Sequence, residues 1–101
     1  MAQFVRVARV HDLNPGEGRV LVVNGTRVAL FNCEGTFYAI KSTCPHMGGD
    51  LGEGHLTGDI VTCPWHGWRF SVKTGKNPEA EIVGVRTFEV RVDGEDVYVG
   101  V

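Results

Sequence analysis

Hydrophobic residues along this chain alternate with polar ones or gather in short runs, which is the pattern of β-strands. The alternation is clearest from Thr87 to Val92, and it resumes from Val97 to Val101 after a turn at Asp93-Gly94. A first strand is predicted over Phe4 to Val10. No stretch of ten or more residues has helical spacing with capping residues.

Tight turns connect the predicted strands. The β-rich runs Val20 to Val23 and Val28 to Phe31 are separated by Asn24-Gly25-Thr26, and Asn-Gly is a strong signal for a tight hairpin. Glu34-Gly35-Thr36 predicts a second turn, leading into the run Phe37 to Ile40. The pattern indicates an all-β protein, either a small sandwich or a barrel.

Composition narrows the class of protein. The chain has 101 residues, 43% of them hydrophobic and 22% charged, which fits one soluble globular domain over residues 1–101. The formal net charge of -2 argues against a nucleic-acid binder. No apolar run approaches the roughly 20 residues of a membrane span, and the N-terminus lacks the pattern of a signal peptide. We therefore expect a cytoplasmic protein.

Residues 42–75 differ from the rest of the chain. They hold three of the four histidines, two of the three cysteines and both tryptophans, with many glycines between them. Such a turn-rich insertion between two β halves usually needs a disulfide or a metal to hold it together. An odd number of cysteines does not suggest a disulfide framework.

Two short motifs in this stretch carry the candidate chemistry. Cys44-Pro45-His46 and Cys63-Pro64-Trp65-His66 each supply one thiolate and one imidazole. A structural zinc site is one interpretation, since mixed cysteine and histidine ligands suit tetrahedral zinc. Zinc sites usually pair like ligands at each knuckle, however, whereas here each loop mixes the two types. This arrangement suits a two-iron cluster, with both cysteines on one iron and both histidines on the other.

The motifs resemble the two cluster-binding loops of a Rieske [2Fe–2S] protein. The similarity extends over Cys44-Pro45-His46-Met47-Gly48-Gly49 and Cys63-Pro64-Trp65-His66-Gly67-Trp68, and Asn77-Pro78-Glu79 corresponds to the family's third, proline-containing loop. The resemblance covers nearly the whole chain. It implies the Rieske (ISP-like) fold, an antiparallel β-sandwich or barrel with an inserted small cluster-binding subdomain. The basal β part would be about 1–41 and 76–101, and the cluster-binding part about 42–75.

The resemblance also implies the ligands of one Rieske-type [2Fe–2S] cluster. Cys44 and Cys63 would hold the inner iron, and His46 and His66 the outer one. Family members with a high reduction potential join the two loops by a disulfide, but this chain has Gly49 and Trp65 at those places.

Two hydroxyl side chains of the high-potential members are also missing after the second histidine, where this chain reads Trp68-Arg69-Phe70. Fewer hydrogen bonds to the cluster sulfurs leave the reduced cluster less stabilised. We expect a reduction potential toward the bottom of the Rieske range.

The resemblance points to an electron-transfer protein rather than an enzyme, similar to the ferredoxins of bacterial aromatic-ring dioxygenase systems. It would carry one electron from a flavin-dependent NAD(P)H reductase to a terminal oxygenase, docking transiently near Pro45, Met47, Pro64 and Trp65. The alternative is a Rieske-like small subunit of an assimilatory nitrite reductase or another multi-subunit oxidoreductase. The Rieske domain of an oxygenase is disfavoured, because the chain ends at Val101 and leaves no residues for a second iron site. A respiratory role is disfavoured by the missing anchor and disulfide cysteines.

The remaining candidates have structural interpretations. Cys33 is expected to be a small buried hydrophobic residue, and His11 and His55 to be surface residues in polar loops. Asp50 and Glu53 are expected to be turn and solvation residues, since nothing in the sequence pairs them with a substrate pocket.

Overall fold

Antiparallel β-strands make up most of the protein in the computed structural model, which describes residues 3–45, 48–65 and 67–101. The only helices among these residues are two single turns of 3₁₀-helix, so the all-β prediction is confirmed. The elements are β1 (Phe4–Arg9), η1 (Val10–Asp12), β2 (Gly18–Val23), β3 (Thr26–Cys33), β4 (Thr36–Lys41), η2 (Leu51–Glu53), β5 (His55–Thr57), β6 (Ile60–Thr62), β7 (Arg69–Ser71), β8 (Lys76–Asn77), β9 (Ala80–Gly84), β10 (Thr87–Asp93) and β11 (Asp96–Gly100).

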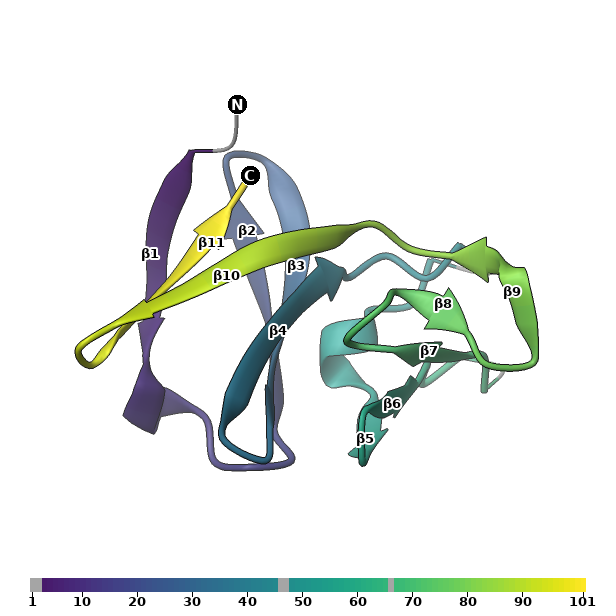
Figure 1. The fold of residues 1–101 in the computed structure, drawn as a ribbon. Coiled ribbons are helices and arrows are strands. Elements are labelled where there is room, and N and C mark those ends of the chain that lie inside the picture. Colours follow the sequence, from purple (N-terminus) through teal and green to yellow (C-terminus); the bar gives the residue numbers. More distant parts are fainter. Residues whose placement is uncertain (1–2, 46–47, 66) are drawn as a thin grey trace.

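Six strands form a nearly closed barrel, in the order β1-β11-β10-β4-β3-β2. Figure 1 shows it as one of two lobes, and the start of β1 pairs with the end of β11, Phe4 with Gly100, at one end of it. The hairpin between β2 and β3 turns at Asn24 and Gly25, with φ values of 49° and 79°. The tight turn that the Asn-Gly pair predicts requires positive φ at both positions. The structure confirms this turn.

The second lobe is inserted between β4 and β10, two strands that lie side by side in the barrel. The chain leaves and returns at neighbouring points, because Lys41 N–H donates to the Arg86 carbonyl at 2.8 Å and Ile40 pairs with Thr87. The insertion contains the three-stranded sheet β5-β6-β7 and the two-stranded sheet β8-β9. It can therefore present loops at the far end of the molecule without interrupting the barrel.

Strands β3 and β4 hold the two lobes together by contributing to both hydrophobic cores. On β3, Val28 and Leu30 face the barrel core, whereas Ala29, Phe31 and Cys33 face the core of the second lobe. All residues from Val28 to Cys33 are buried, because both faces of β3 are covered. This explains why the sequence shows a continuous apolar run there instead of alternation.

The turn η2 lies directly against the backbone of β2. A β-carbon on Gly52 would be 2.9 Å from the backbone nitrogen of Val20, a separation that real β-carbons do not show. Only glycine allows this close approach. The first cysteine loop, which ends immediately before η2, is thereby fixed relative to the barrel.

Candidate metal centre

Cys44 and Cys63 begin two backbone loops of similar design. The Cys44 N–H donates to the Gly49 carbonyl at 2.8 Å, and the Gly48 N–H donates back to the Cys44 carbonyl at 2.9 Å. In the second loop the Cys63 N–H donates to the Trp68 carbonyl at 2.6 Å. Each loop is thus closed on itself by backbone hydrogen bonds.

The two cysteines are brought together in the core of the second lobe. Their exposed fractions are 1% for Cys44 and 2% for Cys63, and neither forms a disulfide. A β-carbon on Gly49 would be 3.1 Å from the Cys63 sulfur, so the backbone of the first loop passes close to the sulfur of the second. Two residues nineteen positions apart in the chain therefore belong to one site.

The Cys63 thiol has an unfavourable environment for ionisation by itself. Burial raises its pKa, and the neighbouring Cys44 thiol raises it further. A hydrogen bond from the backbone N–H of Trp65 acts in the opposite direction, since it favours the thiolate and lowers the pKa. The two buried sulfurs, with a backbone donor to one of them, could bind a metal group. The positive charge of the metal would stabilise both thiolates.

The histidine half of the predicted site is not described by the structure. His46 and His66, like Met47, lie outside the described residues. Within the described part of the chain, no group of three or more histidine, cysteine, aspartate or glutamate side chains is placed to hold a metal ion. The two cysteines therefore fit an iron–sulfur group, and the assignment of the two histidines stays a prediction.

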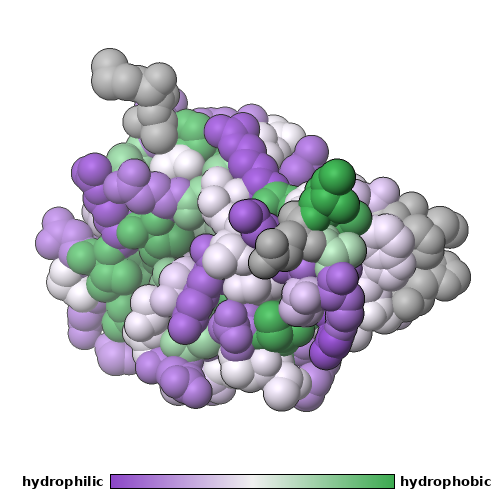
Figure 2. All heavy atoms as spheres, turned by 45° about the vertical axis from the view of Figure 1, so that its right-hand side comes forward, coloured by the Kyte–Doolittle hydropathy of each residue, from purple (hydrophilic) through white to green (hydrophobic). Residues whose placement is uncertain are grey.

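Exposed side chains follow each buried cysteine in the chain. Trp65 is 55% exposed, and Pro45 and Pro64 are also exposed, as expected for residues of a docking surface. On the face shown in Figure 2, hydrophobic side chains lie in separate small groups among polar ones.

The second loop continues into β7 without a hydroxyl aimed at the cysteines. Trp68 is partly buried against the core of the second lobe, and Phe70 is fully buried in it. The next hydroxyl along the chain, that of Ser71, donates to Asp59 at 3.0 Å and accepts from the backbone N–H of Lys73 at 3.2 Å. The Ser71 hydroxyl is thus already hydrogen-bonded to residues of its own lobe.

The proline-containing third loop is ordered by its own polar residues. The Asn77 side-chain oxygen accepts from the N–H groups of Glu79 at 2.8 Å and Ala80 at 3.2 Å, which makes a compact Asx turn. An ion pair between Glu79 and Arg69 joins this turn to β7. The third loop and the second cysteine loop are therefore tied to each other at the surface.

Sequence reasoning missed one interaction beside the site. Asp50, expected to be a turn and solvation residue, accepts two hydrogen bonds from the Arg27 guanidinium, at 3.0 Å and 2.7 Å. It also accepts one at 3.1 Å from the Ser42 hydroxyl. The pKa of Asp50 is held below its ordinary value, mainly by the Arg27 guanidinium and to a lesser extent by the Ser42 hydroxyl. Because 23 positions separate Arg27 and Asp50, no local sequence pattern announces this pair.

The other candidates lie where their structural interpretations place them. Cys33 is buried at the end of β3, and its thiol donates to the Gly58 carbonyl at 3.2 Å. His11 and His55 are exposed, as expected, although His11 lies in η1 and His55 begins β5 rather than lying in loops. Among the described residues, none of the three belongs to a group of three or more side chains that could hold a metal ion.

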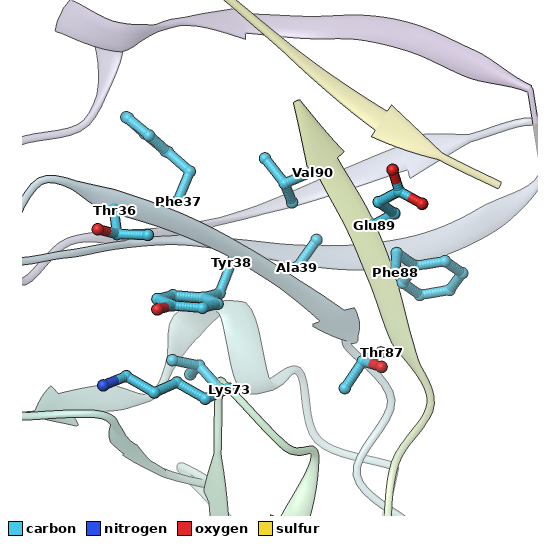
Figure 3. A pocket seen from close by; sticks show the side chains of 10 residues that line it. Thr36, Phe37, Tyr38, Ala39, Lys73, Thr87, Phe88, Glu89 and Val90 are labelled. Atoms are coloured by element: carbon cyan, nitrogen blue, oxygen red, sulfur yellow. The ribbon is translucent and has the colours of Figure 1, made fainter. Parts of the chain in front are cut away.

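A groove of about 450 Å³ lies between β4, β10 and the segment after β7. Figure 3 shows its side chains, with Lys73 below Tyr38 and Glu89 on the opposite side. The Lys73 ammonium is 6.0 Å from the centre of the Tyr38 ring. No predicted ligand lines this groove, so the candidate chemistry lies in the cysteine loops and not in the groove.

An all-β fold with two loops that bring a buried pair of cysteines together is compatible with an iron–sulfur protein. Comparison with known protein families narrows the class: residues 3–97 match the model of the Rieske [2Fe-2S] domain. The chain belongs to this family and carries one Rieske-type [2Fe–2S] cluster.

Curated relatives include ferredoxin components of oxygenase systems. The chain is 38% identical to the alkene monooxygenase system ferredoxin component of Xanthobacter autotrophicus, over 97% of this chain and 81% of that protein. It is 35% identical to the biphenyl dioxygenase ferredoxin subunit of a Pseudomonas species, over 95% of this chain and 90% of that protein.

A solved structure titled as the complex of reduced oxygenase and oxidised ferredoxin in carbazole 1,9a-dioxygenase contains a similar chain. The TM-score is 0.87 at 36% identity, with 96% of this chain and 92% of that chain covered. Within the described residues, no helix is both long enough and apolar enough to cross a membrane.

Proposed function

We propose that this protein is a one-electron carrier whose cluster is held by Cys44, His46, Cys63 and His66, with residues 42–75 as the cluster-binding part. The observation that carries the proposal is the close approach of the two cysteine loops around two buried cysteines, where the Gly49 backbone lies close to the Cys63 sulfur. When bound, the cluster supplies a site that takes up and releases one electron. The chain itself holds the sulfurs out of water and donates a backbone hydrogen bond to one of them.

A low reduction potential is part of the proposal. Hydrogen bonds to cluster sulfurs stabilise the more negative, reduced state and raise the potential. Trp68 and Phe70 supply no hydroxyl, and the Ser71 hydroxyl is committed to Asp59. A carrier with a reduction potential at the bottom of the Rieske range is reduced efficiently only by a strong reductant. A flavin-dependent NAD(P)H reductase is a source of this kind.

The partner that receives the electron is proposed to be a terminal oxygenase. The related chain in the carbazole dioxygenase structure comes from a complex of ferredoxin with oxygenase, at 36% identity to this chain. Docking would use the exposed residues Pro45, Pro64 and Trp65, with Met47 beside them in the sequence. A cytoplasmic location belongs to the same proposal, since three free cysteines suit a reducing compartment.

Rapid mixing tests this function directly. The chemically reduced protein is mixed anaerobically with an oxidised aromatic-ring oxygenase, and the recovery of the oxidised spectrum is followed. One electron transferred per chain at a rate that increases with oxygenase concentration is expected. A reduced protein that keeps its electron in the presence of the oxygenase, while giving it up to ferricyanide, would contradict the proposed direction of transfer.

A second candidate function is supported by another solved structure. A chain titled as the putative small subunit of a nitrite reductase (NADPH) matches with a TM-score of 0.83 at 28% identity, over 96% of this chain. A permanent subunit would co-purify with its large subunit from the native cell, whereas a shuttle would be recovered alone. Size-exclusion chromatography of the natively expressed protein distinguishes the two functions.

A further inference from the structure

The Arg27–Asp50 ion pair joins the barrel to the first cysteine loop. Arg27 lies near the start of β3, and its guanidinium contacts both oxygens of Asp50, at 3.0 Å and 2.7 Å. The Asp50 side chain is only 22% exposed, against 49% for Arg27. The Ser42 hydroxyl donates to the same carboxylate and accepts from the Gly52 N–H at 3.3 Å. The carboxylate is therefore held in one place.

Asp50 lies close to both cysteine loops. It follows Gly49, where a β-carbon would lie 3.1 Å from the Cys63 sulfur. It also pairs across a β-bridge with Thr43, the residue before Cys44. A fixed negative charge and a fixed positive charge thus stand beside the loops that hold the two sulfurs.

We propose that the Arg27–Asp50 pair keeps the charge beside the cluster loops balanced, so that neither charge by itself shifts the reduction potential of the protein. Reduction adds one negative charge at the site. A nearby carboxylate disfavours that charge and a nearby guanidinium favours it, while the intact pair nearly cancels both effects. Arg27 and Asp50 act on the site through the electric field of their charges, and neither is a ligand. This inference rests on the proposed ligand role of Cys44 and Cys63.

The two members of the pair predict opposite effects on the potential. Arg27→Gln leaves Asp50 without its counter-charge, so the reduced state is disfavoured and the potential falls. Asp50→Asn leaves Arg27 as an uncompensated cation, so the reduced state is favoured and the potential rises. Both substitutions disrupt the two-point contact between the two side chains. A merely structural role of the pair would therefore shift the potential in the same direction in both variants.

The experiment measures the midpoint potentials of the two single variants, the double variant and the parent protein, all with the cluster bound. At a fixed solution potential we expect the ratio of reduced to oxidised protein to fall about twofold to tenfold in Arg27→Gln and to rise by a similar factor in Asp50→Asn. A tenfold change corresponds to about 59 mV for a one-electron couple. The double variant should return to the parent potential, and high salt should shrink both shifts, since Arg27 is half exposed.

A matched control pair lies on the barrel. Arg6 and Asp96 form an exposed ion pair at 2.8 Å between β1 and β11, strands that contribute no residue to the core that contains the two cysteines. Arg6→Gln and Asp96→Asn should leave the potential unchanged. A shift in these variants equal to that at Arg27 and Asp50 would show an effect of net charge alone and would overturn the proposal.

Shifts of the same sign in Arg27→Gln and Asp50→Asn, or no shift in either, would also overturn it. If Asp50→Asn does not assemble the cluster, Arg27→Lys decides, because lysine keeps the charge but loses the two-point contact. Arg27→Lys must then stay near the parent potential while Arg27→Gln falls, and equal shifts contradict the proposal. A parent protein without a reversible one-electron couple would instead contradict the proposed function itself.

Discussion

A β-carbon on Gly49 would be crowded by the side chain of Trp65. Such an atom would be 3.0 Å from Trp65 Cγ and 3.2 Å from Trp65 Cβ, in addition to 3.1 Å from the Cys63 sulfur. These are the two positions at which high-potential relatives are expected to carry the cysteines of a disulfide between the loops. In this protein the loops are joined there by packing of an indole against a bare backbone.

Gly49→Ala tests this packing. The added methyl group would crowd Trp65 and the Cys63 sulfur, which must shift by a few tenths of an ångström, and we expect this to cost about 1–3 kcal/mol in the free energy of unfolding. Faster loss of the cluster absorbance in urea is the expected result. Gly58→Ala is the control in the same lobe: its φ of 60° makes alanine strained, but nothing lies within 4 Å of the new atom. Equal rates of cluster loss in the two variants would show that the contact with Trp65 has no special role.

Trp65→Ala is expected to slow electron transfer to the oxygenase about tenfold, equivalent to ~1.4 kcal/mol, since exposed aromatic residues often dominate docking interfaces. The reduction potential should stay nearly unchanged, because the hydrogen bond at the Cys63 sulfur comes from the backbone N–H of residue 65 and survives the substitution. Stopped-flow mixing and voltammetry measure the two quantities. Val22, 64% exposed on the barrel strand β2, supplies the control variant Val22→Ala. An unaltered rate in Trp65→Ala would remove Trp65 from the docking surface.

His66→Ala should abolish the characteristic visible spectrum of the cluster and lower the iron content of the purified protein. The prediction follows from the proposed ligand set, in which two histidines hold one iron. His55→Ala, at an exposed position at the start of β5, should keep both properties. A normal spectrum and two irons per chain in His66→Ala would refute the ligand role of His66.

Asp50 is expected to make the stability of the protein depend on acid pH. Its pKa is held below the ordinary value of 3.8, mainly by the Arg27 guanidinium. The ionised carboxylate therefore stabilises the fold fully above that ordinary value, and this contribution is lost as the pH falls from there through the lowered pKa. Denaturant unfolding of the parent and Asp50→Asn, at several pH values between 6 and 2.5, measures the difference. The two proteins should converge in stability toward the acid end, and a constant gap would contradict the assignment.

Ser42→Ala separates the hydroxyl from the ion pair. Ser42 is fully buried, and its hydroxyl both donates to Asp50 and accepts from the Gly52 N–H. Removing it should lower the free energy of unfolding by about 1–3 kcal/mol, because a buried N–H loses its partner. An unchanged denaturation midpoint would show that Gly52 finds another acceptor.

Features that depend on neighbouring residues could be predicted from the sequence. The turn at Asn24 and Gly25 requires positive φ at both positions, and Asn and Gly are the residue types that adopt it most readily. The short strands β5, β6 and β7 were not predicted, because three residues are too few to show a period of two. Sequence reasoning instead described this segment as loop-rich.

Features that depend on the fold could not be predicted from the sequence. The Arg27–Asp50 pair joins β3 to a loop 23 positions away, and nothing in either local pattern indicates the other. The packing of Trp65 on Gly49 likewise exists only because the two cysteine loops meet. The motif spacing identified the cysteine pair, whereas the charges and contacts that surround it required the structure.

The reduction potential of the anaerobically purified protein, measured by film voltammetry from neutral to strongly alkaline pH, tests the central claim most directly. Rieske potentials extend from about −150 to +300 mV. The account predicts a reversible one-electron couple near the lower end, because neither Trp68 nor Phe70 offers a hydroxyl to the cluster and Ser71 is bonded to Asp59. A potential near the upper end would contradict this account of the site and its proposed role between a flavoprotein reductase and an oxygenase.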